Sequence, residues 1–168
     1  FSQIIYARVY NSLTGCANGI SNFNAIVNPE PTTENVSNLS FCDDDLDGDD
    51  TNGFVQNIDL DSQTTAILGP LQDPDDFTVT FHETQADASA GTDALSSPYT
   101  NTTADQQTIF VRVVNDDTLC VNDDFTFDVI VNPLPKFTVT SPQIVCLSGP
   151  PLTLFVENPA AVYDYVWT

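Results

Sequence analysis

A long internal repeat constrains this chain of 168 residues more than any other feature. The segment QIIYARVYNSLTGCANGISNFNAIVNPEP, residues 3–31, aligns without gaps to QTIFVRVVNDDTLCVNDDFTFDVIVNPLP, residues 107–135. The offset of 104 residues (107 minus 3) also relates Cys42 to Cys146. Chance does not keep a cysteine, an arginine and a Pro-x-Pro pair in register, so the repeat marks a structural unit of this length.

The repeat period divides the chain into three parts. Residues 1–31 are predicted to be the last two strands of a preceding module, residues 32–135 a complete module, and residues 136–168 the start of a following module. Two Pro-x-Pro pairs, 29–31 and 133–135, mark the junctions. Proline cannot continue a hydrogen-bonded ladder and favours a stiff, extended chain, so we expect semi-rigid joints there.

Alternation of apolar and polar residues predicts short strands in the complete module. The third part ends in an alternating run after Cys146 that includes Trp167, a spacing similar to the first strands of an immunoglobulin-like sandwich. The sequence therefore predicts an all-β fold of tandem antiparallel, immunoglobulin-like or cadherin-like β-sandwich modules. Strands are expected over 35–41, 54–60, 77–82, 108–114 and 124–131, with one helical turn near 85–90.

The charge balance excludes several classes of partner. Asp and Glu number 24 against 3 Lys and Arg, which gives a net charge of −21. Nucleic acids and anionic membrane surfaces require clustered basic residues, so neither is expected to bind. Hydrophobic residues make up 41% of the chain, enough for a core. There is no methionine and no visible signal peptide, so we expect a mature segment of a longer protein.

Four cysteines occur without metal-type spacing. Cys42 and Cys120 are the two cysteines of the complete module, and the repeat places Cys16 and Cys146 at the same positions of the flanking parts. The prediction is a Cys42–Cys120 disulfide, with the partners of the other two outside the chain. Such a bridge stabilises by about 4.5 kcal/mol in the chain-entropy model and implies an oxidising, extracellular setting. Buried free thiols are the alternative.

The run FCDDDLDGDD, residues 41–50, is the strongest candidate site. Alternate aspartates before a glycine resemble the first half of a calcium loop, because calcium takes six to eight oxygen ligands. The twelfth position is Phe54 rather than glutamate, so an EF-hand is excluded. The alternative is a solvated acidic turn whose repulsion is screened by salt. The predicted calcium ligands are Asp43, Asp45, Asp47 and Asp49, and a second register of Asp45, Asp47, Asp49 and Thr51 is equally possible.

Other candidates for chemistry are weak, and the chain is not expected to be an enzyme. No nucleophile triad, zinc-protease motif or phosphate-binding loop is present. The single histidine, His82, is expected to be exposed on the polar face of a strand. Arg112 and its repeat equivalent Arg8 are expected to pair with a carboxylate, with Asp128 as the candidate partner of Arg112.

The motifs CDDDLDG, VTFHETQADA and IFVRV resemble tandem modules of very large surface proteins in gliding and marine Bacteroidota. The resemblance covers residues 32–135 and the half module 3–31. It implies export by the type IX secretion system, an extracellular or cell-surface location, and a passive role in an adhesin or surface filament. It also identifies Asp117-Thr118-Leu119 as a low-specificity O-glycosylation pattern, with Thr118 as the acceptor.

The sequence thus predicts a stiff structural spacer stabilised by a disulfide and calcium. Its expected partners are neighbouring modules of the same chain, with lateral contacts to other copies and surface glycans left open. A fibrous assembly is expected, built either as beads along one chain or by strand donation between chains. The alternative function is a carbohydrate-binding module of a secreted enzyme, which would need an exposed aromatic platform.

Overall fold

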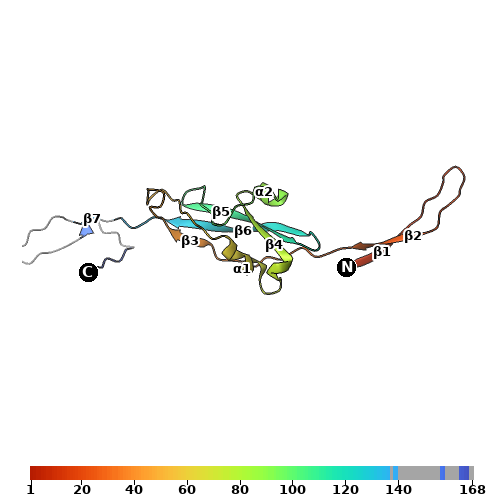
Figure 1. The fold of residues 1–168 in the computed structure, drawn as a ribbon, viewed down its shortest axis with the longest axis horizontal. Coiled ribbons are helices and arrows are strands. Elements are labelled where there is room, and N and C mark those ends of the chain that lie inside the picture. Colours follow the sequence, from red (N-terminus) through yellow and green to blue (C-terminus); the bar gives the residue numbers. More distant parts are fainter. Residues whose placement is uncertain (137, 140–155, 158–162, 167–168) are drawn as a thin grey trace, which may run out of the picture.

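The computed structural model describes residues 1–136, 138–139, 156–157 and 163–166 (Figure 1). The predictions for Cys146 and Trp167 therefore lie outside the described residues. In the third part of the chain, the strands β7 (Thr138–Val139) and β8 (Val156–Glu157) pair antiparallel.

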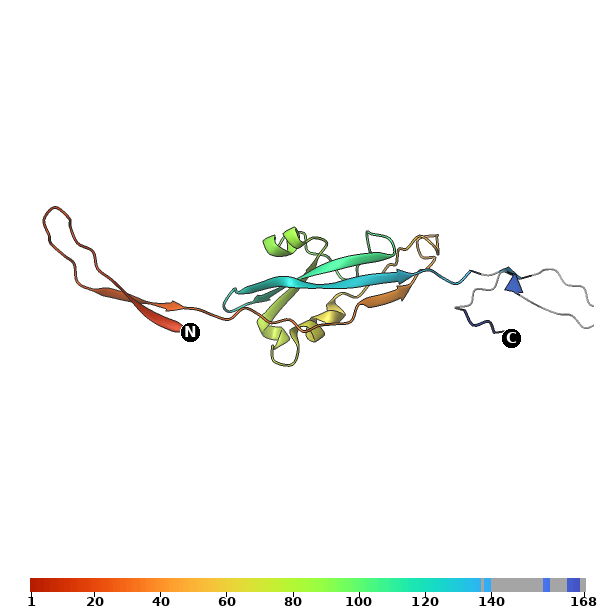
Figure 2. The ribbon, with the colours of Figure 1, turned by 180° about the vertical axis from the view of Figure 1, so that it is seen from behind.

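A four-stranded sheet forms the centre of the complete module. Its strands are β3 (Leu39–Cys42), β4 (Phe77–His82), β5 (Gln106–Asn115) and β6 (Val121–Asn132), in the order β3-β6-β5-β4 (Figures 1 and 2). β4, β5 and β6 are antiparallel neighbours, whereas β3 runs parallel to β6. Alternation located β4, β5 and β6 correctly, but it could not give the direction of β3.

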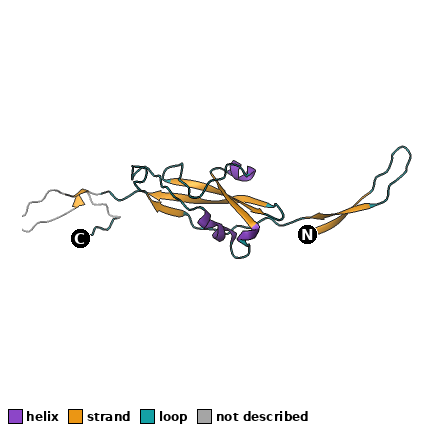
Figure 3. Ribbon diagram, in the orientation of Figure 1, coloured by secondary structure: helices purple, strands orange, loops and turns teal. Residues whose placement is uncertain are grey.

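One face of the sheet is covered by a thin second layer, so the predicted all-β sandwich class is confirmed (Figure 3). This layer contains an antiparallel bridge between Ile58 and Tyr99, the 3-10 turn η1 (Asp61–Gln63) and the short helix α1 (Thr64–Leu68). The strand expected over 54–60 is reduced to that bridge. Asn57 has a φ of 62°, a left-handed conformation that interrupts an extended run.

The hydrophobic core lies between these two layers. The inward residues of the strands alternate with outward ones, as the sequence period requires. Phe81 and Phe127 meet edge to face, with ring centroids 6.1 Å apart, a favoured aromatic geometry. The buried apolar side chains are Val55, Ile58, Leu60, Ile67, Leu68, Phe81, Tyr99, Ile109, Val111, Val113, Phe127, Val129 and Val131.

The opposite face of the sheet carries helix α2 (Gln85–Ala90), which the sequence predicted as a helical turn. Thr84 caps its first turn by accepting from the Asp87 amide. A second 3-10 turn, η2 (Pro74–Asp76), precedes β4. None of the helices in the described residues is both long and apolar enough to cross a membrane.

The N-terminal hairpin reproduces the β5–β6 hairpin of the complete module. It consists of β1 (Ser2–Ala7) and β2 (Ser21–Ile26), and its Ser2–Ile26 pair corresponds, 104 residues on, to Gln106–Ile130. The bridge Tyr10–Ala17 likewise corresponds to Val114–Val121. The repeat found in the sequence is therefore also a repeat of strand register.

Candidate functional site: the two ends of the sheet

The candidate site comprises the two ends of the four-stranded sheet. The entry end is the turn between β5 and β6, residues 116–120, with η2 bonded to it at Asp76, beside the linker at Pro31. The exit end is where β3 and β6 both finish, with Cys42 opposite Asn132, followed by the acidic loop 43–53. In Figure 1 these ends face the N-terminal hairpin and the C-terminal part of the chain, respectively.

The two cysteines of the module lie at opposite ends. Cys120 precedes the first residue of β6, and Cys42 pairs with its last. The eleven steps from Val121 to Asn132 span about 36 Å at the usual strand rise. A disulfide requires α-carbons within about 7 Å, and no disulfide joins the two cysteines within the described residues. The structure therefore corrects the predicted Cys42–Cys120 bridge. Because β3 runs parallel to β6, the two cysteines lie at opposite ends of β6.

At the exit end, Asp43 closes the acidic loop as a clasp. Its side chain is buried, and its Oδ2 accepts a hydrogen bond of 2.8 Å from the amide of Gly53. Its Oδ1 accepts from the amide of Asp44 at 2.9 Å, and its own amide donates to the Asn132 carbonyl at 2.8 Å. Amide donors compensate the buried carboxylate, and the clasp holds the residue next to Cys42 in place.

Gly53 connects this clasp to the rest of the fold. Its carbonyl accepts from the side chain of Asn101 at 2.9 Å and from the amide of Asp105 at 3.0 Å. The Asp105 carbonyl in turn accepts from the amide of Val131 in β6. Gly53 has a φ of 78°, and a Cβ placed there would lie 2.5 Å from Oδ1 of Asp105. Only glycine satisfies both the conformation and the space.

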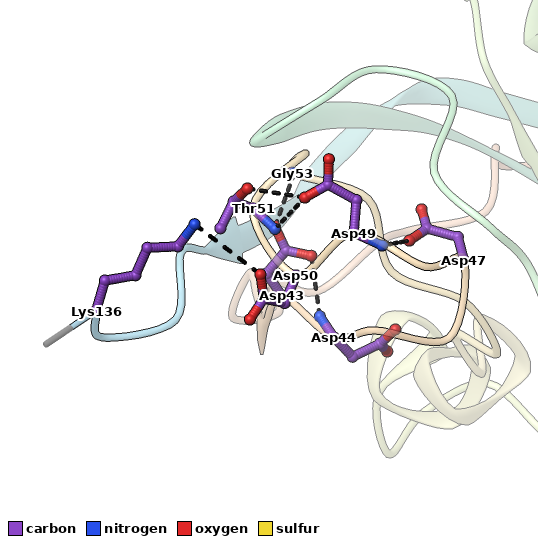
Figure 4. A network of polar contacts seen from close by, with 8 residues as sticks. All are labelled: Asp43, Asp44, Asp47, Asp49, Asp50, Thr51, Gly53 and Lys136. Carbon is purple, nitrogen blue, oxygen red and sulfur yellow. Dashed lines mark hydrogen bonds and ion pairs between the residues drawn. The ribbon is translucent and has the colours of Figure 1, made fainter. Parts of the chain in front are cut away.

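Three of the other aspartates of the run, Asp44, Asp47 and Asp49, form local side-chain turns (Figure 4). Asp44, Asp47 and Asp49 each accept the amide of the residue two positions later, at 2.9, 3.1 and 3.0 Å. The carbonyl of Asp45 accepts from the amide of Gly48 at 3.0 Å. Lys136, in the linker that follows β6, lies 4.0 Å from Asp50. Such side-chain turns are the ordinary way in which aspartate stabilises a loop.

The four predicted calcium ligands therefore do not converge in this structure. Asp43 points inward to the Gly53 amide, whereas Asp47 and Asp49 serve separate turns. Within the described part of the chain, no three acidic, cysteine or histidine side chains form a group that could hold a metal. The pKa of Asp47 is lowered, first by the hydrogen bond from Asn52 and then by the Asp49 amide. These hydrogen-bond donors stabilise part of the negative charge that calcium was predicted to stabilise.

At the entry end, the turn that carries Cys120 matches the turn that carries Cys16. The Asn115 amide donates to the Cys120 carbonyl at 3.0 Å, and the equivalent Asn11–Cys16 bond measures 2.8 Å. The side chain of Asn122 donates to the Pro31 carbonyl at 2.8 Å. This bond fixes the turn beside the linker that enters the module.

Thr118, the predicted glycosylation acceptor, lies in the entry-end turn. Its hydroxyl donates to Oδ1 of Asn115 at 2.8 Å. A glycan on this oxygen would remove that donor, because the hydroxyl proton is replaced on modification. Glycosylation of Thr118 stays a prediction.

Two other sequence-based expectations are corrected by the structure. His82 is 0% exposed rather than solvent-facing, and its ring nitrogens contact the Thr80 hydroxyl at 2.9 Å and the Thr92 carbonyl at 2.8 Å. Segment 91–95 covers this position, which strand alternation alone cannot reveal. Arg112 donates to the Ala88 carbonyl at 2.9 Å and the Ser89 carbonyl at 3.1 Å, so it caps α2 instead of pairing with Asp128.

The profile of the Flavobacterium inter-domain disulphide bond domain (FIDD) matches residues 38–135. The chain belongs to this family. The match begins just before β3 and ends in the Pro-x-Pro segment after β6, so the FIDD domain coincides with the four-stranded unit. Searches of curated proteins and of solved structures gave no match. The match thus supports the predicted resemblance at the level of a Bacteroidota-type domain.

The separated cysteines of the FIDD domain are the feature that sequence analysis missed. The repeat identified both positions, but the pairing depended on strand direction, which no residue pattern encodes. Gly53 and Leu119 were missed as well. The left-handed conformation of Leu119 could have been predicted, because Leu119 aligns with Gly15 in the repeat. A glycine at a turn position indicates a left-handed backbone.

Proposed function

We propose that this chain is a non-enzymatic structural segment of an extracellular adhesin or filament, in which FIDD domains are joined end to end by disulfides. The observation that carries the proposal is the position of Cys42 and Cys120 at opposite ends of β6. A domain that presents one thiol at each end can link to a neighbour on both sides but cannot close a bridge within itself.

The repeat identifies which cysteines are within reach of each other. Cys42 lies opposite Asn132, and Asn28 is the equivalent of Asn132 in the preceding module. The position-42 cysteine of that module would therefore lie beside Asn28. Asn28 precedes Pro31, the linker residue that Asn122 contacts, by three residues, or at most about 10 Å of extended chain.

Cys120 is thus proposed to pair with the position-42 cysteine of the preceding module. By the same geometry, Cys42 pairs with the turn cysteine of the following module. Cys16, which occupies the equivalent of position 120, pairs one junction further upstream. None of these partners lies within residues 32–135.

Charge explains why a covalent link is useful at these junctions. The exit end carries the aspartate run 43–50. The entry end is also acidic, and like charges facing each other across a junction repel at low ionic strength. A disulfide holds the two ends together whatever the salt concentration. The exposed acidic residues of the entry end are Asp73, Asp75, Asp76, Asp116, Asp117 and Asp124.

The remaining parts of the proposal follow from this linkage. Disulfides persist in oxidising compartments, which supports a cell-surface location after export by the type IX secretion system. Stiff joints at the Pro-x-Pro segments allow reach to grow with the number of modules. The partners are neighbouring modules of the same chain, and the net charge of −21 disfavours nucleic acid.

Peptide mapping without reduction, on the full secreted protein, tests the proposal. We expect peptides containing Cys42 and Cys120 to be crosslinked to peptides from outside residues 32–135. A Cys42→Ser variant should release one free thiol in the following module and leave the Cys120 crosslink intact. Recovery of a Cys42–Cys120 peptide, or of both cysteines as free thiols, would refute the proposal.

A further inference from the structure

Leu119 is held in a conformation that leucine disfavours. Its φ is 59°, in the left-handed region, and its side chain is 73% exposed. Non-glycine residues adopt this region rarely, because Cβ crowds the following carbonyl. An exposed leucine gains little from burial, so local packing does not offset this strain.

The turn itself does not require a leucine. In the equivalent turn, Gly15 takes the same conformation with a φ of 70°. The stabilising bonds are also equivalent: Leu119 donates to the Asn115 carbonyl at 2.8 Å, and Gly15 donates to the Asn11 carbonyl at 2.8 Å. Glycine would therefore serve the fold better at position 119, and the leucine side chain needs another explanation.

Both turns present an exposed leucine close to the cysteine. In the first turn it is Leu13, 95% exposed and three residues before Cys16. In the second it is Leu119, directly before Cys120. The leucine positions differ between the turns, so the shared property is an apolar side chain at the tip rather than a common role in turn formation.

We infer that Leu119 is a docking contact that packs against the exit end of the preceding module. The inference rests on the proposed end-to-end linkage and deepens it by naming the surface that aligns the two cysteines. The hydrogen bond from Asn122 to Pro31 keeps the turn next to the linker, so the preceding module is the partner within reach.

The exit end of this module offers a matching apolar group. Leu46 is 62% exposed in the acidic loop and follows Cys42 by four residues. The amide of Leu46 is fixed by the Asp44 side chain at 2.9 Å. A leucine within four residues of each cysteine gives the two acidic ends an apolar contact near the disulfide, and burying it removes apolar surface from water.

Reductive titration of the full secreted protein tests the docking contact. The ratio of reduced to oxidised dithiothreitol that opens half of the Cys120 crosslink is measured by alkylation and mass spectrometry. Leu119→Asn keeps a residue that tolerates the left-handed turn but removes the apolar contact. We expect half of the Cys120 crosslink in this variant to open at a dithiothreitol ratio about tenfold lower than in the natural protein. This shift corresponds to losing the burial of about one leucine side chain.

Three further variants make the result specific. Leu119→Met, which keeps an apolar side chain, should stay close to the natural ratio. Leu13→Ser changes a leucine that is 95% exposed in the turn one junction upstream and should leave the ratio at Cys120 unchanged. Leu46→Ser should shift the ratio at Cys42 and leave Cys120 unchanged.

The outcomes separate the two proposals. If Cys120 is crosslinked but its ratio is unchanged in Leu119→Asn, the docking contact is refuted while the linkage stands. If Leu119→Asn and Leu13→Ser shift the ratio at Cys120 equally, the effect is not specific and the contact is also refuted. If Cys120 carries no crosslink in the natural protein, the end-to-end linkage itself fails.

Discussion

Gly53 is the residue on which the exit end depends most. Its amide binds the Asp43 carboxylate, and its carbonyl accepts from Asn101 and Asp105. The start of the acidic loop and the segment 101–105 therefore meet at one residue without a side chain. An added side-chain atom at Gly53 would push the acidic loop away from the end of β6. Asp43, the neighbour of Cys42, would move with the loop.

We predict that Gly53→Ala lowers the free energy of unfolding by about 3 kcal/mol, because it adds a steric clash to a strained φ. Gly48→Ala is the matched control, since Gly48 has a φ of 96° but no atom within 4 Å of the added Cβ. That variant should lose only about 1 kcal/mol. Urea unfolding followed by circular dichroism measures both, and equal losses would contradict the clash.

At the scale of elements, the loop after the Ile58–Tyr99 bridge is tied to β5 by a partly buried polar network. The Tyr99 hydroxyl donates to Oε1 of Glu83 at 2.9 Å and accepts from the Gln107 side chain at 2.8 Å. Burial raises the pKa of Tyr99 above its ordinary value of 10.0, and the neighbouring Glu83 acts in the same direction.

This raised pKa gives stability a defined alkaline dependence. Below pH 10 both the folded and the unfolded states keep the tyrosine proton. As pH rises above 10, the unfolded state releases its proton first, so stability falls until the raised pKa is passed. We expect Tyr99→Phe to flatten this fall between pH 9 and 11, in urea titrations at each pH. The exposed Tyr10→Phe variant should keep the natural slope.

Strand positions were predictable from sequence, whereas strand direction was not. The 77–82 segment became β4 with those bounds, because period-two alternation reports which residues face the core. The same alternation holds for parallel and antiparallel neighbours. Only an antiparallel β3 could run toward the Cys120 end of β6, whereas the parallel register places Cys42 beside Asn132. The disulfide error therefore follows from one undetermined direction.

The candidate site was predictable in location but not in bonding. The sequence singled out the 43–50 run correctly as an unusual element next to a cysteine. It could not show that Asp43 is buried and bound to an amide ten residues later, because that contact depends on how the loop closes. Calcium binding by Asp45, Asp47 and Asp49 stays a prediction, distinct from the clasp formed by Asp43.

At the scale of the whole molecule, the net charge of −21 makes stability depend on cations. If the acidic loop binds calcium, chelation with EDTA at low ionic strength should lower the melting temperature, since an ion that binds the folded state stabilises it. Asp45→Asn combined with Asp47→Asn should remove this dependence. Asp43→Asn should lower the melting temperature equally with and without EDTA. If EDTA leaves the melting temperature of the natural protein unchanged, the calcium prediction is wrong and the run is a solvated acidic turn.

The parallel pairing of β3 and β6 has a mechanical consequence for a chain under tension. Both strands run from the entry end to the exit end. With the proposed linkage, one covalent track enters at Pro31, follows β3 and leaves through the Cys42 crosslink. A second track enters through the Cys120 crosslink and follows β6 to the next linker. A pulling force then passes along two continuous backbones, and no module has to unfold to bear it. Reduction would transfer the same load to the hydrogen bonds between β3 and β6, so an oxidised chain resists stretching while a reduced one can extend.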